Sequence, residues 1–126
     1  MSQPVTLVLP ASAEYVVVAR LTASGIGSRS LPSMADLEDL KLAVAEACNL
    51  LISLQATSLA LEFNPLEEGL AVKVVGEGCT QPVPSVDSEE GLPLMLMEAV
   101  VDEFNVDSAP GRVELHLTLI RSGQVE

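Results

Sequence analysis

The segment LEDLKLAVAEACNLLISLQ (Leu37–Gln55) decides the fold, because it is the longest stretch of the chain with one unbroken hydrophobic period. Its apolar residues recur at alternating steps of three and four, which predicts an α-helix with one buried stripe. The stripe consists of Leu37, Leu40, Val44, Ala47, Leu51 and Leu54. Ser33 is the predicted N-cap, and Asp36 stands three residues further on, as in a capping box. We therefore place this helix at the centre of the core.

Glu46 puts a carboxylate among small residues in the middle of this helix. One interpretation is a solvated charge at the edge of the stripe. The other is an active-site helix in which Glu46 acts as a base. Leu50 shares a face with Glu46 one turn later, and Asn49 is the neighbouring polar group. Spacing alone favours the solvated charge and leaves the other interpretation open.

Composition bounds the class of protein. A chain of 126 residues predicts one domain over residues 1–126. The net charge of −12, with six scattered cations, argues against binding to nucleic acid or to anionic membrane surfaces, and suits a basic surface on another protein. Two cysteines imply no disulfide framework and a reducing compartment. No basic signal sequence and no apolar run of about 20 residues is present, so the expected location is cytoplasmic.

The remaining periodic segments give the order β-α-α-β-β-α-β. This order predicts an α+β two-layer sandwich, in which a mixed, mainly antiparallel sheet of four strands has three helices on one face. Gly25 and Gly27 are expected to end or loosen the first helix. Lys73 is expected opposite Glu62 on the solvent face of a hairpin. The expected strands are Pro4–Leu9, Leu59–Phe63, Leu70–Val75 and Arg112–Arg121. The expected helices are Ala13–Ala23, Leu37–Gln55 and Leu92–Phe104. A long irregular loop is expected at Gly76–Glu90 and a turn at Asn105–Gly111.

We expect no catalytic or metal-binding role for the histidine and the two cysteines. His116, the only histidine, falls on the polar face of the last strand, where we expect no catalytic or metal role. Cys48 is expected in the core, and Cys79 is expected in an exposed loop without a basic neighbour to activate it. No metal site is predicted.

Four segments together resemble the bacterial anti-sigma factor serine kinases, members of the GHKL group with the Bergerat, or histidine-kinase-like, ATPase fold. The resemblance covers Leu9 to about Ile120 and implies that fold, ATP and Mg²⁺ as cofactors where the family activity is retained, and a sigma factor or an anti-anti-sigma protein as partner. The segments are EYVVVARLTASGIGSR (Glu14–Arg29), EDLKLAVAEAC (Glu38–Cys48), LAVKVVGEG (Leu70–Gly78) and GLPLMLMEAVVDEF (Gly91–Phe104).

The first family motif is only partly present. Glu46 matches the glutamate that activates the nucleophile in the family. The family's Mg²⁺-binding asparagine, one turn later, corresponds to Leu50, which has no oxygen for a cation that demands oxygen ligands. Asn49 is adjacent, but one residue on a helix is a rotation of about 100°. We therefore expect Glu46 to be weak or vestigial as a catalytic residue.

The other nucleotide motifs also depart from the family pattern. The Asp-x-Gly motif that accepts the adenine amino group reads Gly76-Glu77-Gly78, without the aspartate. The Gly-x-Gly turn that cradles phosphate corresponds to Gly91-Leu92-Pro93, and Pro93 has no N–H to donate. The loop Cys79–Glu90 is shorter than the usual ATP lid, and it is acidic. The predicted site is thus a degenerate, occluded nucleotide pocket at Asn49, Leu50, Gly76, Gly78, Gly91 and Pro93, with Leu50 against the loop at residues 76–78.

The resemblance leaves three hypotheses. The first is a regulator that binds partner proteins without using ATP, through a surface that includes Arg20, Thr22 and Gly25. The second is an active ATP-dependent protein serine kinase that phosphorylates an anti-anti-sigma partner. The third is a small-molecule sensor whose pocket is lined by Leu50 and Pro93. Homodimerisation stays open in all three.

Overall fold

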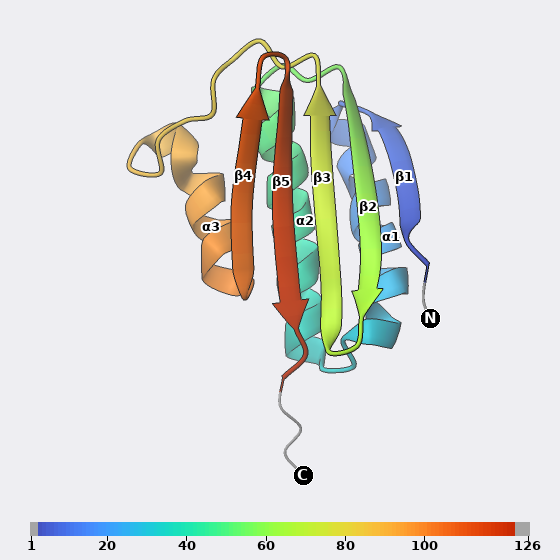
Figure 1. The fold of residues 1–126 in the computed structure, drawn as a ribbon. Helices are drawn as coiled ribbons and strands as arrows, with labels where there is room; N and C mark the ends of the chain where they lie inside the picture. The colour runs from blue at the N-terminus through green and yellow to red at the C-terminus, as the bar shows by residue number, and fades with distance from the viewer. Residues whose placement is uncertain (1–2, 123–126) are drawn as a thin grey trace.

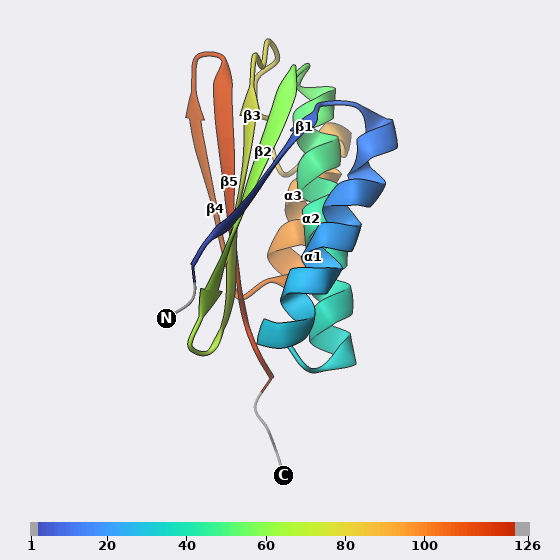
Figure 2. The same cartoon turned by 90° about the vertical axis from the view of Figure 1, so that its right-hand side faces the viewer.

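The structure is a computed structural model that describes residues 3–122 and has two layers. A five-stranded sheet forms one layer, and three helices cover one of its faces, so the other face of the sheet is open (Figures 1 and 2). The elements are β1 (Val5–Pro10), η1 (Ala13–Tyr15), α1 (Val16–Ser30), α2 (Met34–Ser53), β2 (Ser58–Leu66), β3 (Gly69–Glu77), η2 (Glu89–Gly91), α3 (Leu92–Val100), β4 (Glu103–Ala109) and β5 (Arg112–Ile120).

The sheet has the strand order β1-β2-β3-β5-β4. This confirms the predicted α+β sandwich with one sheet and helices on one face. Every pairing between neighbouring strands is antiparallel, so the sheet is not mixed as expected. The predicted pair of Glu62 and Lys73 is confirmed, because the two residues are partners in the register and their charged atoms lie 3.4 Å apart.

Helix α2 lies between α1 and α3 and supplies much of the core (Figure 1). It starts at Met34, three residues before the expected start, and ends at Ser53, two residues before the expected end. The predicted N-cap is confirmed, because the Asp36 N–H donates to Ser33 Oγ at 3.3 Å. Its fully buried residues are Leu40, Ala43, Val44, Ala47, Cys48, Leu50 and Leu51.

The expected end of the first helix is wrong, because α1 continues through both glycines to Ser30. Gly27 is buried and faces α2 so closely that a Cβ there would overlap with Leu40 Cδ2. Close packing against α2 therefore outweighs the low helix propensity of glycine. Gly27 is in the helix because it permits this contact.

The expected helix Leu92–Phe104 and turn Asn105–Gly111 are also wrong. Helix α3 ends at Val100, and Glu103–Ala109 forms the edge strand β4, which makes five strands instead of four. Phe104 and Val106 pack against the core, while Glu103, Asn105 and Asp107 point away, which is the period of a strand. Gly111, at φ 78°, closes the tight β4–β5 turn in the left-handed region that glycine adopts readily.

Both thiols are buried, so the expectation of an exposed Cys79 is wrong, whereas the core position of Cys48 is confirmed. The Cys79 side chain lies against the end of β3, with Sγ 3.7 Å from the Gly76 carbonyl oxygen. Burial raises the pKa of the Cys48 thiol to about 12. At neutral pH Cys48 is therefore a protonated packing residue and not a nucleophile.

Candidate functional site

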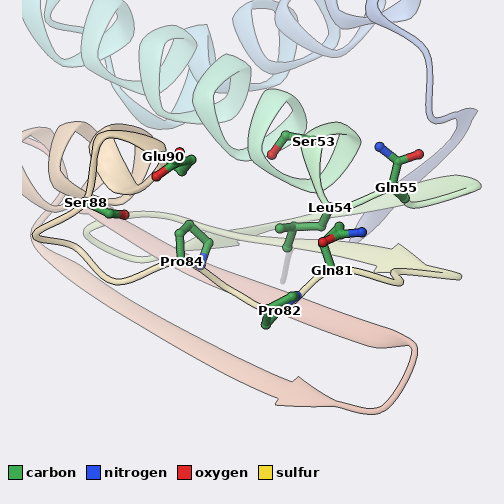
Figure 3. Close-up of a pocket in the computed structure, with 8 residues that line it drawn as sticks. All are labelled: Ser53, Leu54, Gln55, Gln81, Pro82, Pro84, Ser88 and Glu90. Carbon is green, nitrogen blue, oxygen red and sulfur yellow. The ribbon is translucent and has the colours of Figure 1, made fainter.

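A cleft of about 490 Å³ lies between the C-terminal end of α2 and the loop that follows β3 (Figure 3). The loop leaves β3 at Glu77 and passes the end of α2 before it reaches α3 (Figure 1). The cleft is lined by Ser53, Leu54, Gln55, Gln81, Pro82, Pro84, Ser88 and Glu90.

The end of α2 fixes one wall of this cleft. Gln55 adopts φ 72°, a left-handed conformation that commonly terminates helices. The Leu54 carbonyl oxygen, released from the helix ladder, accepts hydrogen bonds from the N–H groups of Thr80 at 3.0 Å and Gln81 at 3.2 Å. These two bonds tie the start of the loop to the helix, so the loop has a defined position over the α2 end.

The far end of the loop is folded on itself. The Ser88 hydroxyl donates to the Ser85 carbonyl oxygen at 2.7 Å and accepts from the Gly91 N–H at 3.1 Å. Gly91 is buried, and a Cβ there would overlap with the Ser85 carbonyl oxygen. Pro93 follows as the second residue of α3 and has no N–H. The N–H of Gly91 is therefore already used within the protein.

The predicted catalytic and metal-binding positions on α2 do not line the cleft. Glu46 is half-buried, Asn49 is exposed and Leu50 is buried. The cleft begins one turn later, at Ser53. Because adjacent residues of a helix are rotated by about 100°, Asn49 and Leu50 lie in different environments. Leu50 points into the core and Asn49 points to solvent.

The two glycines of the degenerate adenine motif are packed and do not face the cleft. A Cβ at Gly76 would lie 3.1 Å from Leu51 Cδ2 and 3.3 Å from Ala56 Cβ. Gly78 has φ 82°, and its N–H donates to the Gly111 carbonyl oxygen at 2.7 Å. The neighbours nearest to Gly76 are therefore Leu51 and Ala56, and the expected contact of Leu50 with this loop stays a prediction.

The predicted partner-binding residues lie on α1. Arg20 and Gly25 are exposed, and Thr22 is half-buried, with its hydroxyl donating to the Val18 carbonyl oxygen at 2.9 Å. Because successive residues of a helix are rotated by about 100°, Arg20 and Thr22 point in different directions. The three residues share a helix but not a single face.

The cleft-lining residues were missed by sequence reasoning. Ser53 and Gln55 follow the last position of the hydrophobic stripe, and Gln81 and Glu90 lie in an irregular loop, so no periodicity marks them. One local signal was available, because Ser88 stands three residues before Gly91 at the start of a helical segment. The lining contains the Glu90 carboxylate and no cationic side chain.

Residues 9–119 match the family model described as the histidine kinase-like ATPase domain. The chain belongs to this family. The end of α2, the loop after β3 and the start of α3 are where the sequence motifs of this ATPase family were expected. The predicted resemblance to the anti-sigma factor serine kinases is confirmed at the level of the family.

Among the similar proteins are two bacterial serine-protein kinases named RsbW. The protein from Bacillus velezensis is 35% identical, and the alignment covers 92% of this chain and 84% of the relative. The protein from Bacillus subtilis is 34% identical with the same coverage. Each alignment spans 136 residues, which is longer than this whole chain of 126 residues, so the relatives contain residues without a counterpart in this histidine kinase-like ATPase domain.

A solved structure supports the fold independently. The crystal structure of the RsbU and RsbW domains of Rv1364c from Mycobacterium tuberculosis aligns with a TM-score of 0.73 at 13% identity. The alignment covers 94% of this chain but 32% of that longer protein. Within residues 3–122 of the present chain, none of the helices has the length and hydropathy needed to cross a bilayer.

Proposed function

We propose that this chain, as one domain over residues 1–126, is a cytoplasmic anti-sigma-like regulator that acts by binding partner proteins and has lost or weakened ATP binding. The partner is a sigma factor, an anti-anti-sigma protein, or both in turn. The observation that carries the proposal is the distribution of apolar residues on α1.

Helix α1 buries small residues and exposes large ones. Ala19, Ala23 and Gly27 form its buried side. Val17 and Leu21, one turn apart, are 51% and 67% exposed. A helix that only covers a sheet carries its large apolar residues on the inner side. The neighbouring exposed aliphatic residues of α1 support a docking surface, because contiguous exposed apolar residues mark protein interaction sites. The exposed Arg20 beside them is of a residue type enriched at interface hot spots.

The residues at the positions that the resemblance assigns to the nucleotide motifs do not fit Mg-ATP. Leu50 offers no oxygen at the position where the family holds its metal ion, and hard cations bind through oxygen. The Gly91 N–H is engaged by Ser88, and Pro93 has none, so two backbone donors at the start of α3 are absent for a phosphate. The cleft lining adds a carboxylate, Glu90, which repels a polyanion.

The length of the loop supports the same proposal. It runs from Gly78 to Ser88 between β3 and η2 and is tied to the protein at both ends. A short, anchored loop has little freedom to close over a nucleotide.

The alternative is an active protein serine kinase. Two observations favour it: the RsbW relatives are named serine-protein kinases, and the glutamate of the first motif is retained as a half-buried Glu46. In this alternative ATP and Mg²⁺ are the cofactors, and an anti-anti-sigma protein is the phosphoryl acceptor. The small-molecule sensor is weaker, because neither Leu50 nor Pro93 lines the cleft. A homodimer remains compatible with either function.

The test is a binding assay against purified sigma factors and anti-anti-sigma proteins from the same organism, with and without Mg-ATP. We expect one of them to bind without ATP. Leu21→Ala should weaken that binding about tenfold or more, which corresponds to about 1.4 kcal/mol. Leu92→Ala is the matched control, because Leu92 is 53% exposed on α3, which lies on the other side of α2 from α1 (Figure 1).

Two results would overturn the proposal. Binding to none of the candidate partners would remove the regulatory role. Transfer of labelled phosphate from ATP to an anti-anti-sigma protein, lost in Glu46→Gln, would establish the kinase alternative.

A further inference from the structure

The open face of the sheet carries a cluster of potential metal ligands that the proposed function does not use. His116 and Glu114 alternate with buried residues along β5, and Asp107 lies on the neighbouring edge strand β4 as the register partner of Glu114. No helix covers this face (Figure 2). The cluster escaped sequence reasoning because residues 103–109 were not expected to form a strand.

The ligand atoms of the three side chains converge. His116 Nε2 lies 3.1 Å from Glu114 Oε1 and 3.3 Å from Asp107 Oδ2. One ligand atom from each of the three residues lies within 4.8 Å of the others. In a tetrahedral zinc site with bonds of about 2.0–2.2 Å, the ligand atoms are about 3.3 Å apart. The two distances from His116 Nε2 therefore match the ligand separation of a tetrahedral site around a small divalent ion.

The second oxygen of Glu114 is held in place from the other side. Arg112 donates to Glu114 Oε2 from Nη2 at 2.8 Å and from Nε at 3.0 Å, and it also pairs with Glu77 on β3. This leaves Glu114 Oε1 directed at the imidazole. Hydrogen bonds of this type orient metal ligands in proteins. The charge of Arg112 is offset by Glu77. The charge of Lys73, the register partner of His116, is offset by Glu62, so the cluster keeps its negative character.

The geometry points to a binding site for a divalent transition-metal ion of the zinc class on the open face of the sheet, with Asp107, Glu114 and His116 as its three protein ligands. One imidazole and two carboxylates suit Zn²⁺ better than Mg²⁺ or Ca²⁺, which prefer oxygen ligands alone. Three protein ligands leave a fourth position for water or for a side chain of another protein. The ion would also cross-link β4, an edge strand, to β5.

The experiment uses untagged protein, because a polyhistidine tag binds zinc itself. Zn²⁺ is titrated in competition with a chromophoric chelator, and Co²⁺ absorption reports the ligand geometry. We expect one Zn²⁺ per chain in the wild type. His116→Ala and Asp107→Asn should each weaken binding by at least about tenfold. Glu103→Gln is the matched control, since Glu103 is an exposed carboxylate on the same sheet face, on β4, and the variant should bind like the wild type.

Thermal melts without metal show whether each variant is folded. If His116→Ala is unfolded, Asp107→Asn alone provides the test, because Asp107 is exposed and its substitution should not disturb the fold. The proposal fails if the wild-type protein, at millimolar concentration, does not take Zn²⁺ from the chromophoric chelator. It also fails if the folded His116 or Asp107 variant binds as tightly as Glu103→Gln. The three side chains would then form only an ion-pair cluster, and the proposed regulatory function would be unaffected.

Discussion

Gly76 lies against Leu51 so closely that a Cβ at residue 76 would be 3.1 Å from Leu51 Cδ2 and 3.2 Å from Leu51 Cβ. The resemblance to the anti-sigma factor serine kinases implies that this is the position of the acidic residue of the adenine motif. In this chain the space is filled by an aliphatic side chain of α2. Gly76 therefore offers neither a side-chain acceptor nor the room for one.

Gly76→Asp should consequently destabilise the fold and should not recover an adenine site. A carboxylate would be buried between Leu51 and Ala56, at a cost of several kcal/mol, and Gly76→Ala should cost less, about 1–3 kcal/mol from overpacking. Urea unfolding gives both values. Leu51→Ala alone should lower the free energy of unfolding by about 2–5 kcal/mol. In the Gly76→Asp background the same substitution should cost clearly less, because the smaller side chain makes room for the carboxylate. Additive effects of the two substitutions would contradict this account of the contact.

The two glycines of α1 should respond in opposite directions to alanine. Gly25 has no atom within 4 Å of the position of a Cβ, so Gly25→Ala should raise the free energy of unfolding by about 0.5–1 kcal/mol through helix propensity. Gly27→Ala should lower it by about 1–3 kcal/mol, because the added methyl group overlaps with Leu40. Thermal or urea unfolding measures both. Stabilisation by Gly27→Ala would mean that α1 and α2 are further apart than described.

Cys48 should make stability fall at alkaline pH. Its folded pKa is about 12, whereas a thiol in the unfolded chain loses its proton near pH 8.5. Between these values the unfolded state binds fewer protons than the folded state, so the free energy of unfolding falls as pH rises. From pH 8 to pH 10 the wild type should lose about 2 kcal/mol more than Cys48→Ala. Equal losses in the two proteins would show that Cys48 is not buried as a thiol.

Ser88 should control the order of the loop over the cleft. Ser88→Ala removes two hydrogen bonds, to Ser85 and from Gly91, each worth about 1 kcal/mol. Amide hydrogen exchange in residues 79–91 should become roughly 5–30-fold faster, while exchange in α1 provides an internal control and should not change. Unchanged exchange in the loop would mean that other contacts hold it.

Where one period dominates, the sequence predicted the structure well. The stripe of α2 and the alternation of β5 are long, regular and buried on one side, so local pattern and tertiary packing agree. The same agreement allowed the Ser33 cap and the pair of Glu62 and Lys73 to be predicted. These features depend on residues that are near one another in the chain or in a simple hairpin.

The predictions were wrong where contacts between residues distant in the sequence determine the local structure. Gly27 continues α1 because Leu40 of another helix needs the space, and Phe104 belongs to β4 because β5 pairs with it. The cleft could not be predicted for the same reason: it depends on the Leu54 carbonyl oxygen meeting the N–H groups of Thr80 and Gln81. The outer cluster at His116 required β4, which the sequence did not reveal.

We propose that this histidine kinase-like ATPase domain binds ATP far more weakly than its family does. Lost donors and acceptors at Gly76, Leu50 and Pro93 are worth on the order of 4–7 kcal/mol if they add, or about three to five decades of affinity. Because the three groups share one ligand, their effects need not add.

The measurement that tests this claim most directly is calorimetric titration of Mg-ATP into the wild-type protein, with the Bacillus velezensis RsbW as the positive control. We predict no saturable heat at micromolar nucleotide and no rise in melting temperature at millimolar Mg-ATP. A dissociation constant in the micromolar range, dependent on Mg²⁺, would contradict the account.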